Sequence, residues 1–161
     1  MKNENTKFKL TSNFKINILG IKVFQIQATA SFGLIKEGDL GGWVEKENNL
    51  SSSGNAEVSG NAEVSGNAWV SGNAEVYGDA RVSGNAEVSG NARVKITKEY
   101  MTISSLGDFP RTITITKSNK KVVSGCFIGT VKEFEIEVNK KYSAGSDYHL
   151  AIDFIKKWLE L

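Results

Sequence analysis

Valine recurs at every sixth position through the middle of the chain, from residue 58 to residue 94, and alanine stands two residues before each valine. The residue between them is Glu, Trp or Arg, so apolar and polar side chains alternate. This alternation predicts short strands with Ala and Val on one face. The Gly-Asn or Gly-Asp pair between successive strands tolerates positive φ and predicts a corner. The pattern therefore predicts a solenoid whose interior is filled by Val and Ala.

The repeating unit, V-S-G-N-A-E, resembles the hexapeptide-repeat superfamily of left-handed parallel β-helices. The resemblance implies three hexapeptides in each coil, so that residues 18 positions apart should stack. Outward side chains would then form three columns, which are Glu57 with Glu75 and Arg93, Glu63 with Arg81, and Trp69 with Glu87. Members of this superfamily usually pack as three parallel prisms. We therefore expect a homo-oligomer, with a trimer favoured over a dimer, and with the outward aromatic residues Trp69 and Tyr77 buried between subunits.

The segments beside the repeat are expected to cap the open ends of a short coil. Residues 1–48 alternate apolar and polar side chains and predict an N-terminal β-hairpin cap that turns at residues 17–20. The glycine-rich segment 38–45 matches no phosphate-binding fingerprint. We expect it to form a tight turn that leads into the first coil, with Trp43 at its end. Residues 49–97 then form the β-helix.

Residues 98–161 predict a small α+β domain. Strand-like runs come first, at residues 101–103, 112–116 and 121–127. Thr130 and Glu133 are typical of a capping box and predict a helix through about residue 141. A second helix is expected to begin at Ser146 or Asp147. Its apolar stripe would consist of Leu150, Phe154, Ile155, Trp158 and Leu159. The predicted fold class is mainly β, a short left-handed parallel β-helix between a β-hairpin cap and an α+β domain.

Composition narrows the possible functions. The chain has 161 residues, with 20 Lys and Arg against 18 Asp and Glu, and this balance gives no reason to expect specific DNA binding. A single Cys and a single His argue against a disulfide framework and a zinc site, so neither a metal nor a cofactor is expected. No apolar run approaches the roughly 20 residues that span a bilayer, and the first residues lack the apolar stretch of a signal peptide. We expect a cytoplasmic protein without a membrane partner.

Catalysis is not favoured by the residues present. Acyltransferases of the hexapeptide-repeat type typically use a His as general base, near a loop that projects from a coil. This repeat has no insertion and no His. The only His, His149, falls in the second predicted helix, where a solvent-facing or structural role is favoured. Cys126 lies between Gly125 and Phe127 in a strand-like run, which is the setting of a buried small hydrophobic residue. We therefore expect a protein that is not an enzyme.

Two further motifs point to a smaller group of proteins within this superfamily. The segments GDLGGWVEKENNLS at residues 38–51 and GCFIGTVKEF at residues 125–134 resemble those of a group of phage and prophage proteins. Without a catalytic constellation, this resemblance implies a binding protein that counters host antiviral defence. It would sequester an anionic nucleotide signal, such as a cyclic nucleotide or an ADP-ribose-type ligand. Two alternatives stay open, namely the masking of a host defence protein by direct contact and a transferase that uses an acyl or nucleotidyl donor.

The interior of the predicted coil leaves no room for a ligand, because Val and Ala fill it. An anionic ligand would bind at a seam, where a basic cap meets the coil or another subunit. Cations would hold its phosphates, and an aromatic ring would stack on its base. The candidate ligand-binding residues are Arg93, Lys95, Tyr77, Arg111, Lys120 and Lys121.

Overall fold

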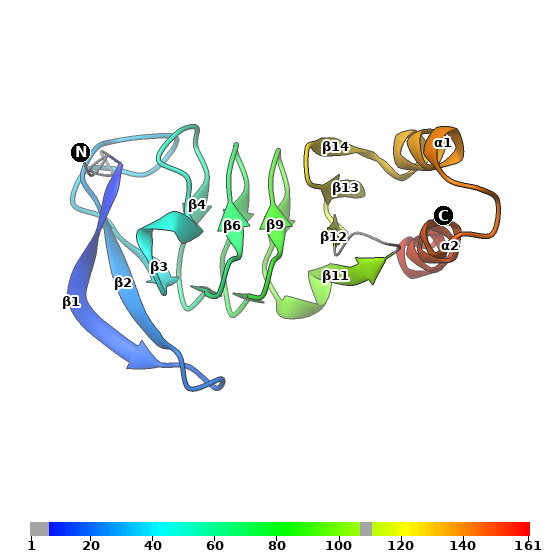
Figure 1. Cartoon of the computed structure of the whole chain (residues 1–161). Helices are drawn as coiled ribbons and strands as arrows, with labels where there is room; N and C mark the ends of the chain where they lie inside the picture. Colours follow the sequence, from blue (N-terminus) through cyan, green and yellow to red (C-terminus); the bar gives the residue numbers. More distant parts are fainter. Residues whose placement is uncertain (1–6, 107–110) are drawn as a thin grey trace, which may run out of the picture. The chain divides into compact units, whose positions relative to one another are not determined.

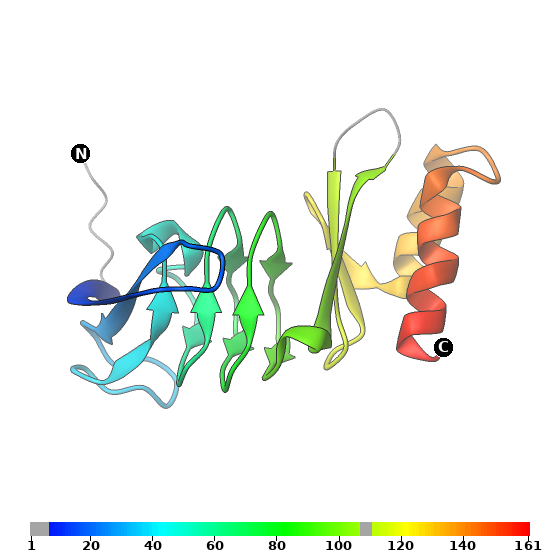
Figure 2. The ribbon, with the colours of Figure 1, turned by 90° about the horizontal axis from the view of Figure 1, so that it is seen from below.

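A computed structural model describes residues 7–106 and 111–161 of the chain (Figures 1 and 2). The fold is mainly β, with two α-helices near the C-terminus. The chain divides into two compact units, residues 1–97 and residues 98–161. Among the described residues, neither helix has the length and apolar character needed to cross a membrane.

Seven strands of two residues each occupy the centre of the first unit (Figure 1). They are β4 (Glu57–Val58), β5 (Glu63–Val64), β6 (Trp69–Val70), β7 (Glu75–Val76), β8 (Arg81–Val82), β9 (Glu87–Val88) and β10 (Arg93–Val94). Parallel pairing joins β4, β7 and β10 in one sheet, β5 and β8 in a second, and β6 and β9 in a third. Each pair matches residues 18 positions apart, as Val58 with Val76, which confirms the predicted stacking. We call residues 54–94 the hexapeptide stack. A rung is one turn of the chain through three successive strands, so that β4, β5 and β6 form the first rung.

The interior of the hexapeptide stack is dry. Every repeat alanine and valine from residue 56 to residue 94 is at most 1% exposed, as the six-residue period predicts. The repeat glycines adopt φ between 63° and 72°, a backbone conformation that a residue with a Cβ rarely adopts. At Gly54 an added Cβ would also lie 2.5 Å from the carbonyl oxygen of Gly72. The corners at Gly54 and Gly78 therefore leave no room for a Cβ, whereas Gly84 and Gly90 have open space there and are explained by their positive φ.

The outward columns carry the charge pairs that their order predicts. Arg93 Nη2 lies 2.8 Å from Glu75 Oε2, and Arg81 Nε lies 3.5 Å from Glu63 Oε2. Trp69 is paired with Glu87 across the third sheet. The Glu75–Arg93 pair is largely exposed and contributes about 0–1 kcal/mol, whereas Glu63 is buried, 6% exposed. The buried Val and Ala columns contribute most of the stability.

The N-terminal segment forms a hairpin of β1 (Phe8–Ile16) and β2 (Lys22–Ala28), with its turn at residues 17–20 as expected. Strand β3 (Leu40–Val44) pairs antiparallel with β2 and parallel with β5. The order β1-β2-β3-β5-β8 thus joins the hairpin to the hexapeptide stack in one sheet. Residues 36–39 form a tight turn in which Gly38 adopts a φ of +91°, but residues 40–44 form β3, so the predicted turn covers only the start of the segment 38–45.

The glycines of β3 are explained by close packing rather than by a turn. A Cβ on Gly41 would lie 2.6 Å from Ile26 Cγ1, and a Cβ on Gly42 would lie 2.8 Å from the carbonyl oxygen of Ala62. Neither residue has positive φ. The pair of glycines therefore lets β3 lie directly against the first rung.

The first rung of the stack has alanine carbonyls that no earlier rung can satisfy. In later rungs such a carbonyl accepts a backbone N–H, as Ala74 O does from Glu57 N at 2.9 Å. In the first rung the donors differ from face to face. Lys7 Nζ donates to Ala56 O at 2.5 Å, Trp43 N to Ala62 O at 2.9 Å, and Asn49 Nδ2 to Ala68 O at 2.8 Å. The N-terminal segment therefore caps an exposed sheet edge, which would otherwise invite pairing with another chain.

Replacing Asn49 by alanine is expected to destabilise the first unit by about 2 kcal/mol. Asn49 is fully buried, in the short 3₁₀-helix η1 (Glu47–Asn49), and its Nδ2 also donates to Gly66 O at 3.2 Å. A buried polar group without a partner costs about 1–3 kcal/mol. Urea unfolding checks this, with Asn73→Ala as the control, because the exposed Asn73 side chain donates to Asn91 Oδ1 at the surface. Equal midpoints for the two variants would contradict the capping role.

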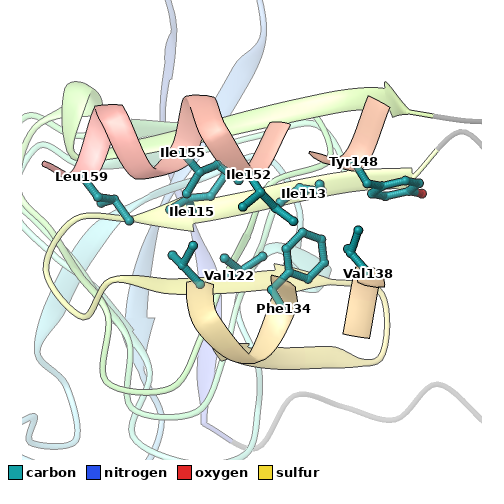
Figure 3. Packing of buried hydrophobic residues seen from close by; sticks show 10 residues of the cluster. Ile113, Ile115, Val122, Phe134, Val138, Tyr148, Ile152, Ile155 and Leu159 are labelled. Carbon is teal, nitrogen blue, oxygen red and sulfur yellow. The ribbon is translucent and has the colours of Figure 1, made fainter. Parts of the chain in front are cut away.

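The second unit begins within the 3₁₀-helix η2 (Thr97–Glu99) and packs two helices on one antiparallel sheet. The strands are β11 (Tyr100–Leu106), β12 (Arg111–Thr116), β13 (Lys121–Ser124) and β14 (Phe127–Thr130), and the helices are α1 (Val131–Lys141) and α2 (Asp147–Leu159). The predicted capping box of α1 is confirmed, since Glu133 N donates to Thr130 Oγ1 and Thr130 N donates to Glu133 Oε2. Figure 3 shows the core, where Ile113, Ile115 and Val122 meet Phe134, Ile152 and Ile155.

The predicted apolar stripe of α2 was only partly right. Ile155 and Leu159 are buried, but Leu150 is 65% exposed and Phe154 is 53% exposed. The buried face consists of Tyr148, Ala151, Ile152, Ile155 and Leu159. These positions recur every three or four residues from Tyr148, so they select a face turned away from Leu150 and Phe154.

Candidate ligand-binding cleft

The second unit contains a cleft of about 630 Å³, within the range of about 300–1,000 Å³ typical of small-molecule sites. Its walls come from the start of β12, the β13–β14 turn, α1 and the start of α2. The lining residues are Arg111, Ser124, Gly125, Cys126, Phe127, Phe134, Glu137, Val138, Lys141, Tyr142 and Tyr148. We call it the β13–α1 cleft. Its size suits a nucleotide better than a lone phosphate ion.

Aromatic rings form much of the wall. The rings of Tyr142 and Tyr148 are stacked, with centroids 4.3 Å apart and an angle of 26° between their planes. Tyr148 ends the aliphatic core on this side, and its hydroxyl points away from the core side chains (Figure 3). Burial, together with the neighbouring Tyr142 hydroxyl, raises the pKa of Tyr148. The Tyr148 hydroxyl therefore stays protonated near pH 7, and the half-buried Tyr142 ring can offer a flat face to a ligand.

Two cations and one carboxylate also line the cleft. Arg111 is the first residue of β12 and Lys141 is the last of α1, and both are exposed. Glu137 accepts a hydrogen bond from Lys140 Nζ at 2.8 Å and lies 3.9 Å from Lys141 Nζ. The hydrogen bond from Lys140 holds the pKa of Glu137 below its usual range, so Glu137 is a carboxylate. Because Lys140 neutralises the charge of Glu137, the positive charges of Arg111 and Lys141 make the cleft attractive to anions.

The β13–β14 turn brings a hydroxyl and a thiol to the cleft. Ser124 is only 6% exposed, and its hydroxyl makes no hydrogen bond with the part of the chain that the structure describes. Cys126 is exposed, which corrects the prediction of a buried side chain. The run 121–127 is not one strand, because Gly125 adopts a φ of +59° and turns the chain between β13 and β14. The glycine inside this strand-like run was the sequence signal for that turn.

The structure divides the sequence-predicted binding residues between the two units. Of the three in the second unit, only Arg111 lines the cleft; Lys120 and Lys121 lie at the β12–β13 turn. Of the other three, Arg93 and Lys95 lie at the last rung of the hexapeptide stack, and Tyr77 lies in the rung before it, where its N–H donates to Val94 O. Arg93 is paired with Glu75 there, and Tyr77 is half-buried. Trp69, the expected interface residue, is 45% exposed.

Sequence reasoning missed three lining residues, Lys141, Tyr142 and Tyr148. The first two end α1 and the third begins α2, so they meet only because a short connection folds the two helices together. The aromatic spacing gives no local signal for this contact. A tyrosine on each side of the connection between the two predicted helices was the available hint.

The only His of the chain and the acidic residues of α1 are engaged in contacts within the second unit. His149 Nδ1 lies 2.8 Å from Ser146 Oγ, and its Nε2 lies 2.9 Å from Asn139 Oδ1. These contacts tie α2 to α1, which is the structural role that the sequence favoured. Glu135 is paired with Lys156 at 2.7 Å. Within residues 7–106 and 111–161, no three His, Cys, Asp or Glu side chains gather as a metal site requires.

A comparison of the chain with protein-family models finds no match, and a comparison with curated proteins finds none.

Proposed function

We propose that this chain is a non-enzymatic binding protein that captures an anionic nucleotide in the β13–α1 cleft. The observation that carries the proposal is the pairing of two cations with a stacked tyrosine pair around about 630 Å³ of space. Arg111 and Lys141 would hold phosphate oxygens through charge-assisted hydrogen bonds. The base would stack on a tyrosine ring, and Ser124 would donate or accept one further hydrogen bond.

The biological role follows from the resemblance to phage and prophage proteins. The captured ligand would be a host antiviral signal, a cyclic nucleotide or an ADP-ribose-type molecule, removed from the bacterial cytoplasm. The hexapeptide stack, as a short left-handed β-helix, would serve as scaffold and assembly element of a homo-oligomer, a trimer before a dimer. This role requires tight binding without turnover.

A transferase is the alternative from another class. Among the residues that line the cleft, Glu137 is the only carboxylate, and its lowered pKa makes it a poor general base near neutral pH. Cys126 is a possible nucleophile, but the lining of the cleft includes no His to activate it. These features favour capture over chemistry.

Masking of a host protein is the second candidate, and one observation favours it. Phe14, Ile16, Ile18 and Leu19 are between 54% and 77% exposed at one end of the N-terminal hairpin. Such an apolar group on the surface marks a contact with another macromolecule.

Incubation with a panel of cyclic dinucleotides, cyclic oligonucleotides and ADP-ribose derivatives separates these possibilities. A capturing protein should deplete one ligand from solution and release it intact after heat denaturation. A transferase would return an altered molecule, and a masking protein would deplete none. Either of those results would overturn the proposal.

The site itself can be followed through Cys126, the only cysteine of the chain. Because Cys126 is exposed in the cleft, a maleimide should label it readily in the ligand-free protein. The bound ligand is expected to slow this labelling by about tenfold at saturation. Tight binding without any change in labelling would place the ligand elsewhere.

A further inference from the structure

The turn between β13 and β14 places the only cysteine of the chain in the wall of the β13–α1 cleft. Ser124 pairs with Phe127, so Gly125 and Cys126 alone connect the two strands. Gly125 has a φ of +59°, whereas Cys126 does not have a positive φ, and this is the pattern of a type II′ turn. A two-residue turn between paired strands leaves its backbone little freedom. The exposed Cys126 side chain therefore starts from a fixed point in the cleft wall.

A buried hydroxyl without a partner lies two residues before this thiol. Residues two positions apart face the same side of a strand, so Ser124 faces the side of Val122, which packs in the core beneath the helices (Figure 3). Ser124 is 6% exposed and lines the cleft, yet its hydroxyl makes no hydrogen bond within residues 7–106 and 111–161. Buried hydroxyl groups nearly always have a partner. The Ser124 hydroxyl is therefore available to a polar group that enters the cleft near Cys126.

The charges of the cleft favour an anionic molecule. Arg111 and Lys141 are exposed cations in the lining, and Glu137 is the only carboxylate among the lining residues. Lys140 Nζ donates to Glu137 Oε1 at 2.8 Å and neutralises this carboxylate. The two cations therefore attract an anion into the cleft and repel a cation of the same size.

Oxidation of Cys126 to a disulfide requires a second molecule, because the chain has no other cysteine. The thiol is exposed, and the cleft has a volume of about 630 Å³, which leaves room for a molecule much larger than a thiol group. A small-molecule disulfide can thus reach the Cys126 sulfur and keep its charged groups within the cleft.

We propose that Cys126 is a modification site at which the chain forms a mixed disulfide with an anionic low-molecular-weight thiol. Arg111 and Lys141 attract the carboxylates of the reagent, and the Ser124 hydroxyl forms a hydrogen bond with an amide of the attached group. The attached group occupies the cleft, so the modification prevents the capture of a nucleotide. This last consequence rests on the function proposed above, whereas the modification itself does not.

The reaction is a thiol–disulfide exchange. The Cys126 thiolate attacks one sulfur of the disulfide form of the reagent, and a new S–S bond forms as the old one breaks. The released half of the reagent leaves as a thiolate and takes up a proton from water, which balances the proton that Cys126 has lost. Cys126 is oxidised, and the released half is reduced by the same two electrons. An excess of the free thiol reverses the exchange, so the modification acts as a switch.

Modification rates with two reagents of opposite charge test the proposal. The full chain is incubated with oxidised glutathione, which is anionic, or with cystamine, which is cationic, and intact-mass spectrometry follows each adduct. The rate with oxidised glutathione divided by the rate with cystamine should be about tenfold higher in the wild type than in Arg111→Gln/Lys141→Gln. The intrinsic reactivities of the two reagents cancel in this comparison.

Lys120→Gln/Lys121→Gln is the matched control, because it removes the same charge from the β12–β13 turn, outside the cleft lining. Its rate ratio should stay within about twofold of the wild type. In about 1 M salt, where charges are screened beyond about 3 Å, the wild-type ratio should fall toward that of the cleft variant. An unchanged ratio in the cleft variant would overturn the proposal, and so would an equal fall in both variants, since net charge alone would then explain it.

The switch is tested with the nucleotide recovered from the panel. The glutathione adduct should bind it about 100-fold more weakly than the unmodified chain, because the adduct occupies the space that must bury the ligand. Dithiothreitol should restore the affinity. Oxidised glutathione should leave the affinity of Cys126→Ser at its own starting value. An adduct that binds the nucleotide undiminished would overturn the switch.

The two kinds of measurement separate this inference from the proposed function. Charge-selective modification in a chain that binds no nucleotide would support the modification site and overturn the function proposed above. Nucleotide binding in a chain whose Cys126 shows no charge selectivity would support that function and overturn the modification site.

Discussion

Replacing Arg111 and Lys141 together by glutamine is expected to weaken the binding of an anionic nucleotide by about 100-fold. Both cations line the β13–α1 cleft, from β12 and from the end of α1. A hydrogen bond to a charged group contributes about 1.5–3 kcal/mol, and 1.4 kcal/mol is a factor of ten in affinity. We take about tenfold for each residue because both are exposed. Isothermal titration calorimetry with the ligand recovered from the panel measures the change.

The matched control is the double variant Lys120→Gln/Lys121→Gln. It removes the same two charges from the same unit but from the β12–β13 turn, outside the cleft. Its affinity should stay within about twofold of the wild type, after the salt-dependent effect of net charge is subtracted. If this control or Arg93→Gln lost affinity while the cleft variant kept it, the site would lie at the other residues that the sequence predicts.

The hexapeptide stack could be predicted residue by residue because its information is local and repeated. A valine every six positions fixes which side chains are buried, and glycine fixes each corner through its positive φ. Stacking by 18 residues, which the resemblance to hexapeptide-repeat β-helices implies, then sets the order of the outward charges and predicts the Glu75–Arg93 and Glu63–Arg81 pairs. Because seven repeats carry the same pattern, the prediction for one repeat is supported by the others.

The cap of the stack could be predicted to exist but not in its details. An open sheet edge needs donors, yet no local pattern shows that Lys7 and Asn49 supply them. The glycines of β3 were assigned to a turn because the close approach of Ile26 and Ala62 involves residues far away in sequence. Tertiary contacts of this kind override a local preference.

The candidate cleft could not be predicted for the same reason. Its tyrosines come from two helices, its cations from β12 and α1, and its thiol from a turn inside one apparent strand. Of the five cations and one tyrosine proposed from the sequence, Arg111 is the one that lines it. The sequence shows which side chains carry the charge needed to bind an anion. The tertiary packing determines which of them come together in one cleft.

The stability of the first unit is expected to rise between pH 8 and pH 10.5 because of Lys7. The Lys7 side chain is 5% exposed and its Nζ lies 4.0 Å from the centroid of the Phe32 ring. Burial lowers the pKa of Lys7 from 10.5 to about 8, although the carboxylate of Glu57 opposes this change. Between these two pH values the unfolded chain keeps a proton that the folded chain has lost. The free energy of unfolding therefore increases with pH there, by up to about 1.4 kcal/mol per unit.

The variant Lys7→Met isolates this effect, because it lacks the titrating amine while other groups titrate in both proteins. Below pH 8 the difference in unfolding free energy between wild type and variant should be constant. It should then shift in favour of the wild type by about 3 kcal/mol by pH 10.5. Urea unfolding followed by tryptophan fluorescence in a Trp158→Phe background reports the first unit, since Trp43 and Trp69 are the remaining tryptophans. Parallel stability curves would mean that the Lys7 amine is solvated and does not cap Ala56 as a buried donor, because a solvated amine keeps its ordinary pKa.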